Sequence, residues 1–141
     1  MKTLASFAMG TAVFAMSLAV LAMPALAHHS FAAEYDQKKP ANMTGTVTKV
    51  EWLNPHARIY LDVKDSDGKV TAWEFELGAP NGLIRSGWTR TSIKPGDVVK
   101  VEGYRAKDGS NLGNAATITM ADGRKLGAGS PIDEPNKDSG K

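Results

Sequence analysis

Two short segments of alternating apolar and polar residues, joined by a turn, constrain the fold of this chain more than any other feature. In residues 57–64 and 71–77 most odd-numbered positions are apolar and most even-numbered ones are polar. This period of two is typical of strands that bury one face. The connecting residues 65–69 favour a three-residue hairpin loop with Gly68 in the left-handed conformation. The cross-strand pairs expected from an antiparallel hairpin are Leu61 with Trp73, Ile59 with Phe75, and Arg58 with Glu76.

Three further segments are predicted to be strands. Residues 44–52 are rich in β-branched side chains. Val47 is at an odd-numbered position and Val50 and Trp52 are at even-numbered ones, so a regular strand would place them on opposite faces. This predicts a bulge in the strand. The segments 98–104 and 115–120 follow turn sequences and complete a set of five.

A short helix is expected between the third and fourth strands, because Leu83, Ile84 and Trp88 are spaced for one helical face. A three-strand meander, a helix and a strand pair follow one another in the order of the OB-type barrel. We therefore predict an all-β fold, a small five-stranded OB-type β-barrel with one short helix between strands 3 and 4. A different small barrel or a β-sandwich is the alternative.

The first 27 residues differ from the rest of the chain. Lys2 is their only charge, and an apolar run ends at Pro24-Ala25-Leu26-Ala27, where small residues at 25 and 27 match a signal-peptide cleavage pattern. We predict export to the periplasm as a soluble protein cut after Ala27, without a membrane span after cleavage. An uncleaved membrane anchor is the alternative, since the run approaches spanning length.

The predicted organisation has four parts: a signal peptide at 1–27, an N-terminal arm at 28–43, the barrel domain at 44–126 and a disordered tail at 127–141. The chain has no cysteine, which excludes disulfides, thiolate nucleophiles and cysteine-based metal sites. Its formal charge of +2 argues against nucleic acid as a partner. No nucleophile, phosphate-binding or dinucleotide-binding motif is present, so an enzyme is not favoured.

Several short motifs occur together in this chain. They are His28-His29-Ser30-Phe31 with Tyr35, Gly45-Thr46-Val47, Trp52-x-Asn54-Pro55-His56-Ala57, Trp73-Glu74-Phe75-Glu76-Leu77, Leu83-Ile84-Arg85-x-Gly87-Trp88 and Lys94-Pro95-Gly96-Asp97. In these motifs the chain resembles a family of small exported bacterial proteins of unknown function, numbered 6152 among domains of unknown function. The resemblance implies export and the domain boundary, but no activity and no catalytic residue.

The histidines are the best candidates for chemistry. Cleavage after Ala27 would make His28 the first residue, and its α-amine and imidazole could chelate one metal ion, with His56 as a third nitrogen ligand. His29 offers a second mode that uses the amine, a deprotonated backbone amide and its imidazole. Thiol-free, nitrogen-rich sites favour Cu(II) or Ni(II), so we predict a binding module for Cu(II) at His28, His29 and His56. The simpler interpretation is that these histidines form a polar chain start and a turn.

The outer barrel face is the second candidate. OB-type barrels bind ligands across strands 2 and 3, where Arg58 and Tyr60 are expected to point outward. On this alternative the protein is a cell-envelope accessory protein that binds a protein or a small ligand without a metal. A copper redox enzyme is a third and least favoured class.

Overall fold

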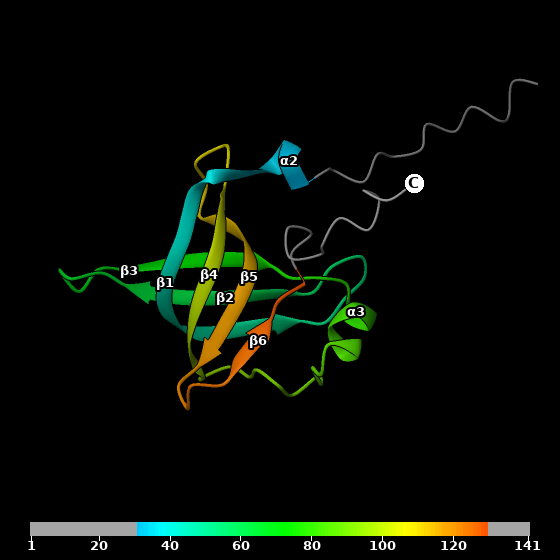
Figure 1. Ribbon diagram of the computed structural model, residues 1–141. Coiled ribbons are helices and arrows are strands. Elements are labelled where there is room, and N and C mark those ends of the chain that lie inside the picture. Colours follow the sequence, from blue (N-terminus) through cyan, green and yellow to red (C-terminus); the bar gives the residue numbers. More distant parts are fainter. Residues whose placement is uncertain (1–30, 130–141) are drawn as a thin grey trace, which may run out of the picture. The chain divides into compact units, whose positions relative to one another are not determined.

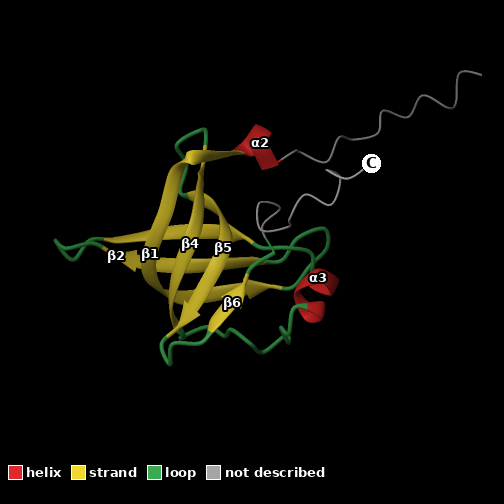
Figure 2. Cartoon of the chain, viewed as in Figure 1, coloured by secondary structure: helices red, strands yellow, loops and turns green. Residues whose placement is uncertain are grey.

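The computed structural model describes residues 31–129, most of which lie in strands (Figure 2). The elements in chain order are α2 (Phe31–Glu34), β1 (Tyr35–Glu51), β2 (Arg58–Lys64), β3 (Val70–Glu76), α3 (Pro80–Arg85), β4 (Val98–Ala106), β5 (Leu112–Met120) and β6 (Lys125–Gly127). The predicted signal peptide, His28 and His29, and residues 130–141 of the predicted tail lie outside the described residues. Within residues 31–129 no helix is long and apolar enough to cross a membrane.

Five strands close into a barrel (Figure 1). The neighbours run β3-β2-β1-β4-β5, all antiparallel, and a parallel pairing between β3 and β5 closes the ring. α3 lies between β3 and β4 in the chain. The predicted OB-type barrel with one short helix in this place is therefore confirmed.

The hairpin of β2 and β3 has the predicted register. Arg58 pairs with Glu76, Ile59 with Phe75 and Leu61 with Trp73. Gly68 has a φ of 84°, which a residue with a side chain rarely adopts. The alternation of apolar and polar residues was sufficient to fix this register because one face of the hairpin is buried.

Strand β1 also contains the predicted bulge. Its register against β2 shifts between Val47 and Lys49, which changes the parity of the buried positions. The strand begins at Tyr35 rather than at Thr44, so that half of the segment predicted as an arm belongs to the sheet. The polar side chains there gave no alternating pattern, and the segment is a strand because its backbone pairs with β4. A register shift between Asp36 and Pro40 accommodates the proline, which cannot donate a ladder hydrogen bond.

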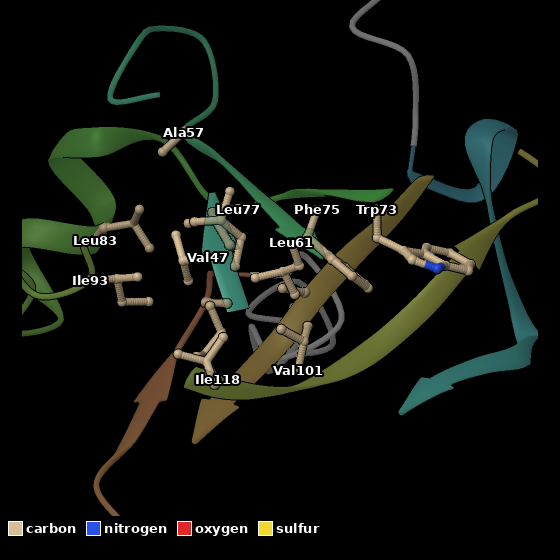
Figure 3. Close-up of a cluster of buried hydrophobic side chains, with 14 of the residues drawn as sticks. Val47, Ala57, Leu61, Trp73, Phe75, Leu77, Leu83, Ile93, Val101 and Ile118 are labelled. Carbon is tan, nitrogen blue, oxygen red and sulfur yellow. The ribbon is translucent and has the colours of Figure 1, made fainter. Parts of the chain in front are cut away.

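Apolar side chains from all five barrel strands fill the interior (Figure 3). Leu83 and Ile93 lie at one end of this core and Trp73 at the other. The prediction that Leu83, Ile84 and Trp88 share one helical face is wrong, because Trp88 lies outside the helix and Ile84 is 51% exposed while Leu83 is buried. The helix ends at Arg85 and the chain turns at Gly87, which has a φ of 93°, so Trp88 reaches the core from outside the helix.

A sixth strand, β6, was not predicted from the sequence. It pairs with β5, and the indole Nε1 of Trp88 donates a 2.8 Å hydrogen bond to the Gly127 carbonyl. Ala128 is fully buried, and its N–H donates to the Ala116 carbonyl at 2.8 Å. The ordered sheet therefore extends past Leu126, where the sequence had placed the end of the barrel.

Candidate functional site

The outward side of β2 and its neighbours carries a cluster of polar side chains. Ile59 and Leu61 are fully buried, so Arg58 and Tyr60 point away from the core, as predicted. The register then places residues of three strands in two rows. One row is Lys49, Tyr60 and Glu74, and the other is Glu51, Arg58 and Glu76. Together with His56, which precedes β2, these seven residues form what we call the outer-face cluster.

His56 and Arg58 meet at Glu76. The Nδ1 atom of His56 lies 3.1 Å from Oε1 of Glu76. Arg58 approaches the other oxygen of the same carboxylate, with Nη2 3.9 Å from Oε2. Nη1 of Arg58 also donates a 2.7 Å hydrogen bond to Glu74. The two sites that the sequence predicted separately, one at His56 and one at Arg58, are thus adjacent.

Tyr60 belongs to the other half of the cluster. Its hydroxyl donates a 3.0 Å hydrogen bond to Oε2 of Glu51, and Lys49 forms an ion pair with the same carboxylate. The Lys49 ammonium lies 4.9 Å from the centre of the Tyr60 ring, in a cation–π arrangement. Tyr60 is therefore held from two directions by residues of β1.

The charges in the cluster are nearly balanced, with two cations and three carboxylates before His56 is counted. Burial acts to lower the pKa of Arg58, but Glu74 and Glu76 outweigh it and raise the pKa above its ordinary value. The hydrogen bond from Lys49 lowers the pKa of Glu51, and the bond from Tyr60 adds to this effect. Both shifts favour the charged forms of Arg58 and Glu51, each of which lies beside a group of opposite charge.

Tyr35 connects the start of the described chain to this cluster. Its ring is almost fully buried, and its hydroxyl makes no hydrogen bond of ordinary geometry with the described residues. Burial raises the pKa of Tyr35, and the negative charge of Glu76 raises it further. The ring centre of Phe31 lies 5.3 Å from that of Tyr35 and 5.8 Å from that of Tyr104. These ring contacts pack α2 against Tyr35 of β1 and Tyr104 of β4.

The described residues do not by themselves complete a metal site. Between 31 and 129 no group of three or more histidine, aspartate or glutamate side chains is arranged to hold a metal ion. Of the predicted ligands only His56 is described. Its Nε2 atom makes no hydrogen bond with the described residues, and its side chain is 44% exposed. His56 could therefore offer one nitrogen ligand, and a metal site that used it would need ligands from outside the described residues.

A separate polar depression of about 300 Å³ lies near the turns before β4 and after β5. Two of its acidic side chains already bind neighbours. Asp97 accepts a 2.8 Å hydrogen bond from the backbone of Lys94, and Asp122 accepts one of 2.7 Å from Arg124. The outer-face cluster therefore remains the better candidate.

Sequence reasoning missed the central role of Glu76 and the involvement of Tyr35. The role of Glu76 could have been predicted, because the predicted register placed it opposite Arg58. Arg58 is only two residues after His56. Tyr35 gave no comparable signal. It lies outside the alternating segments and reaches the cluster only through the pairing of β1 with β4.

Comparison with known proteins gives a family but no activity. No curated protein matches the chain. The model of a family of unknown function, DUF6152, matches residues 15–115, more than two-thirds of the sequence. This match begins within the predicted signal peptide and ends inside β5. The chain therefore belongs to the DUF6152 family, whose function is unknown.

Proposed function

We propose that this protein is an exported, non-enzymatic binding module that holds Cu(II) with His56 and the histidines at a new N-terminus, His28 and His29. The observation that carries the proposal is the contact between His56 and Glu76, 3.1 Å from Nδ1 to Oε1. Metal-binding histidines usually donate their second ring N–H to a carboxylate or a carbonyl, which orients the ring toward the metal. In His56 the Nδ1 atom faces a carboxylate oxygen at 3.1 Å, and Nε2 makes no hydrogen bond with the described residues.

The N-terminal histidines supply the remaining nitrogen donors. After cleavage following Ala27, the α-amine and the imidazole of His28 chelate the ion, and Nε2 of His56 is the third ligand. The second mode, through the amine, a backbone amide and His29, does not use His56. Nitrogen ligands without thiolate suit Cu(II).

The alternative is an accessory protein that uses Arg58 and Tyr60 to bind a protein or a small ligand without a metal. Arg58 is already paired with Glu74, and Tyr60 with Glu51. A ligand on this face would have to replace those interactions, which makes the face a weaker candidate than the available nitrogen of His56. On this alternative, Arg58→Ala and Tyr60→Ala would abolish ligand binding and changes at His28 would not.

Native mass spectrometry of the protein recovered from the periplasm tests the proposal, with a Cu(II) titration against a competing chelator. We expect a chain that begins at His28 and retains one copper, and a large loss of affinity in both His28→Ala and His56→Ala. His29→Ala is the control that separates the two binding modes. A loss in His29→Ala with no effect of His56→Ala would indicate ordinary binding by a histidine-rich terminus. A different N-terminus, or no retained copper, would contradict the proposal.

A further inference from the structure

We infer that Glu76 is a positioning residue that fixes the proton of His56 on Nδ1 and so presents Nε2 as the ligand atom. The second half of this inference rests on the proposed function, whereas the first half is independent of any metal. The sequence paired Glu76 with Arg58 but did not indicate its contact with His56, which joins a loop to the end of another strand.

The short contact between Nδ1 of His56 and Oε1 of Glu76 bears on which ring nitrogen carries the proton. A neutral imidazole has one N–H and one nitrogen with a lone pair, and an ionised carboxylate can only accept hydrogen bonds. With Oε1 of Glu76 3.1 Å from Nδ1 of His56, a lone pair on Nδ1 would face the carboxylate oxygen and be repelled by it, so a proton on Nδ1 is favoured. Nε2 then carries the lone pair, which is the form that binds a metal ion.

The acceptor is held in place by its surroundings. The Glu76 side chain is only 14% exposed, against 44% for His56. The two oxygens of Glu76 have different partners, since Oε1 faces His56 and Oε2 faces Arg58. Arg58 thus lies beside one oxygen of the carboxylate and leaves the other oxygen to the histidine.

The backbone next to His56 is also fixed. The N–H of Leu77 donates to the Ala57 carbonyl at 2.8 Å, and the N–H of Ala57 donates to the Gly78 carbonyl at 3.0 Å. These bonds continue the ladder of β2 and β3 beyond the pair of Arg58 and Glu76. The residue after His56 is therefore bound to the residues after Glu76, so the two side chains start from backbone positions that are held together.

Glu74 provides a matched control. It is on the same strand and the same face as Glu76, and it binds Arg58 through a 2.7 Å hydrogen bond. No contact between Glu74 and His56 occurs in the described part of the chain. Glu74→Gln therefore removes one carboxylate from the cluster without removing the acceptor of His56, and Glu76→Gln removes that acceptor with nearly the same side-chain volume.

The first measurement is the ring tautomer of His56 by ¹⁵N NMR in the metal-free protein, about two pH units above the ordinary histidine pKa. The resonances are assigned by comparison with His56→Ala. We expect the Nδ1–H form in the wild type and in Glu74→Gln. In Glu76→Gln the amide can also donate to Nδ1, so we expect the Nε2–H form to gain population. Circular dichroism confirms that each variant is folded.

The second measurement is Cu(II) affinity by chelator competition in the same three proteins. Loss of an orienting carboxylate usually lowers metal affinity roughly 10- to 100-fold, and we expect this loss in Glu76→Gln but not in Glu74→Gln. An Nε2–H tautomer in the wild type would overturn the inference whether or not the variants fold. Equal copper affinity in Glu76→Gln and the wild type would also overturn it. An Nδ1–H tautomer that depends on Glu76, in a wild-type protein that does not bind copper, would support positioning by Glu76 and contradict the proposed function.

Discussion

The two faces of the hairpin formed by β2 and β3 are built on different physical principles. On the inner face Ile59, Leu61 and Phe75 are fully buried and contact other apolar side chains in the barrel. On the outer face Arg58 and Glu74 are partly exposed and interact with one another at 2.7 Å. The inner face is stabilised by the removal of apolar surface from water, which has no preferred direction. The outer face depends on specific pairs with defined geometry.

This difference determines what each face contributes. Burial of a large apolar side chain contributes a few kcal/mol, about 1.5–3 for a residue such as leucine or phenylalanine. An ion pair that is partly exposed to solvent contributes little, roughly 0–1 kcal/mol, because water screens it. The inner face should therefore account for the stability of the barrel, and the outer face should be free to serve binding.

The most direct test of this comparison replaces neighbouring residues on β3. Phe75→Ala should lower the free energy of unfolding by about 3–5 kcal/mol, since it leaves a cavity in the core. Glu74→Ala should change it by less than about 1 kcal/mol. Urea denaturation followed by tryptophan fluorescence measures both. Similar losses in the two variants would show that the outer face is a structural element rather than a binding surface.

The inner face could be predicted almost completely from the sequence. The alternation in β2 and β3 specified the register, and the change of parity after Val47 indicated the bulge in β1. The start of β1 at Tyr35 and the short strand β6 could not be predicted in this way. Both form because their backbones pair with an already formed neighbour, and such pairing leaves little trace in the local pattern of side chains.

The outer face could be predicted only in part. Parity showed that Arg58 and Tyr60 point outward, and chemistry singled out His56. The carboxylate that each of these three residues contacts depends on side-chain directions across three strands. These directions produce no periodic pattern in the sequence, so they could not be predicted from it. Tyr35, whose hydroxyl has no hydrogen-bond partner among residues 31–129, is the extreme case, because its position depends on the sheet and on α2 together.

A substitution at the edge of the core tests how tightly the inner face is packed. A Cβ atom added at Gly113 would lie 2.5 Å from Cε1 of Phe75, closer than van der Waals contact permits. Gly113→Ala should therefore destabilise the protein by about 1–3 kcal/mol, the usual cost of overpacking. Thermal unfolding followed by circular dichroism measures the change.

Gly127→Ala is the control for this experiment. A Cβ atom there would meet nothing within 4 Å, and Gly127 has no positive φ. We expect its melting temperature to stay close to that of the wild type. If Gly113→Ala were equally well tolerated, the contact between β5 and the Phe75 ring would be looser than the structure indicates.

The smallest expected effect concerns Glu51 on the outer face. The hydrogen bonds from Lys49 and Tyr60 lower the pKa of Glu51 in the folded protein below its ordinary value of 4.5. A carboxylate whose pKa is lowered by folding stabilises the folded state above its unfolded pKa and loses this contribution as the pH falls through the folded pKa. The stability difference between the wild type and Glu51→Gln should therefore be present at pH 7 and shrink as the pH falls below 4.5.

A double-mutant cycle separates this pair from the other acidic groups. Asp108 and Asp122 also have lowered pKa values, caused mainly by Ser110 and Arg124, but both are unchanged in Glu51→Gln and their effects cancel in the comparison. Combining Glu51→Gln with Lys49→Met removes the main cause of the shift, so the coupling between the two substitutions should weaken at low pH and at high salt. A coupling that persisted below the folded pKa of Glu51 would mean that the pair acts through packing. The outer face would then resemble the inner one, and the division of roles between the two faces would fail at this position.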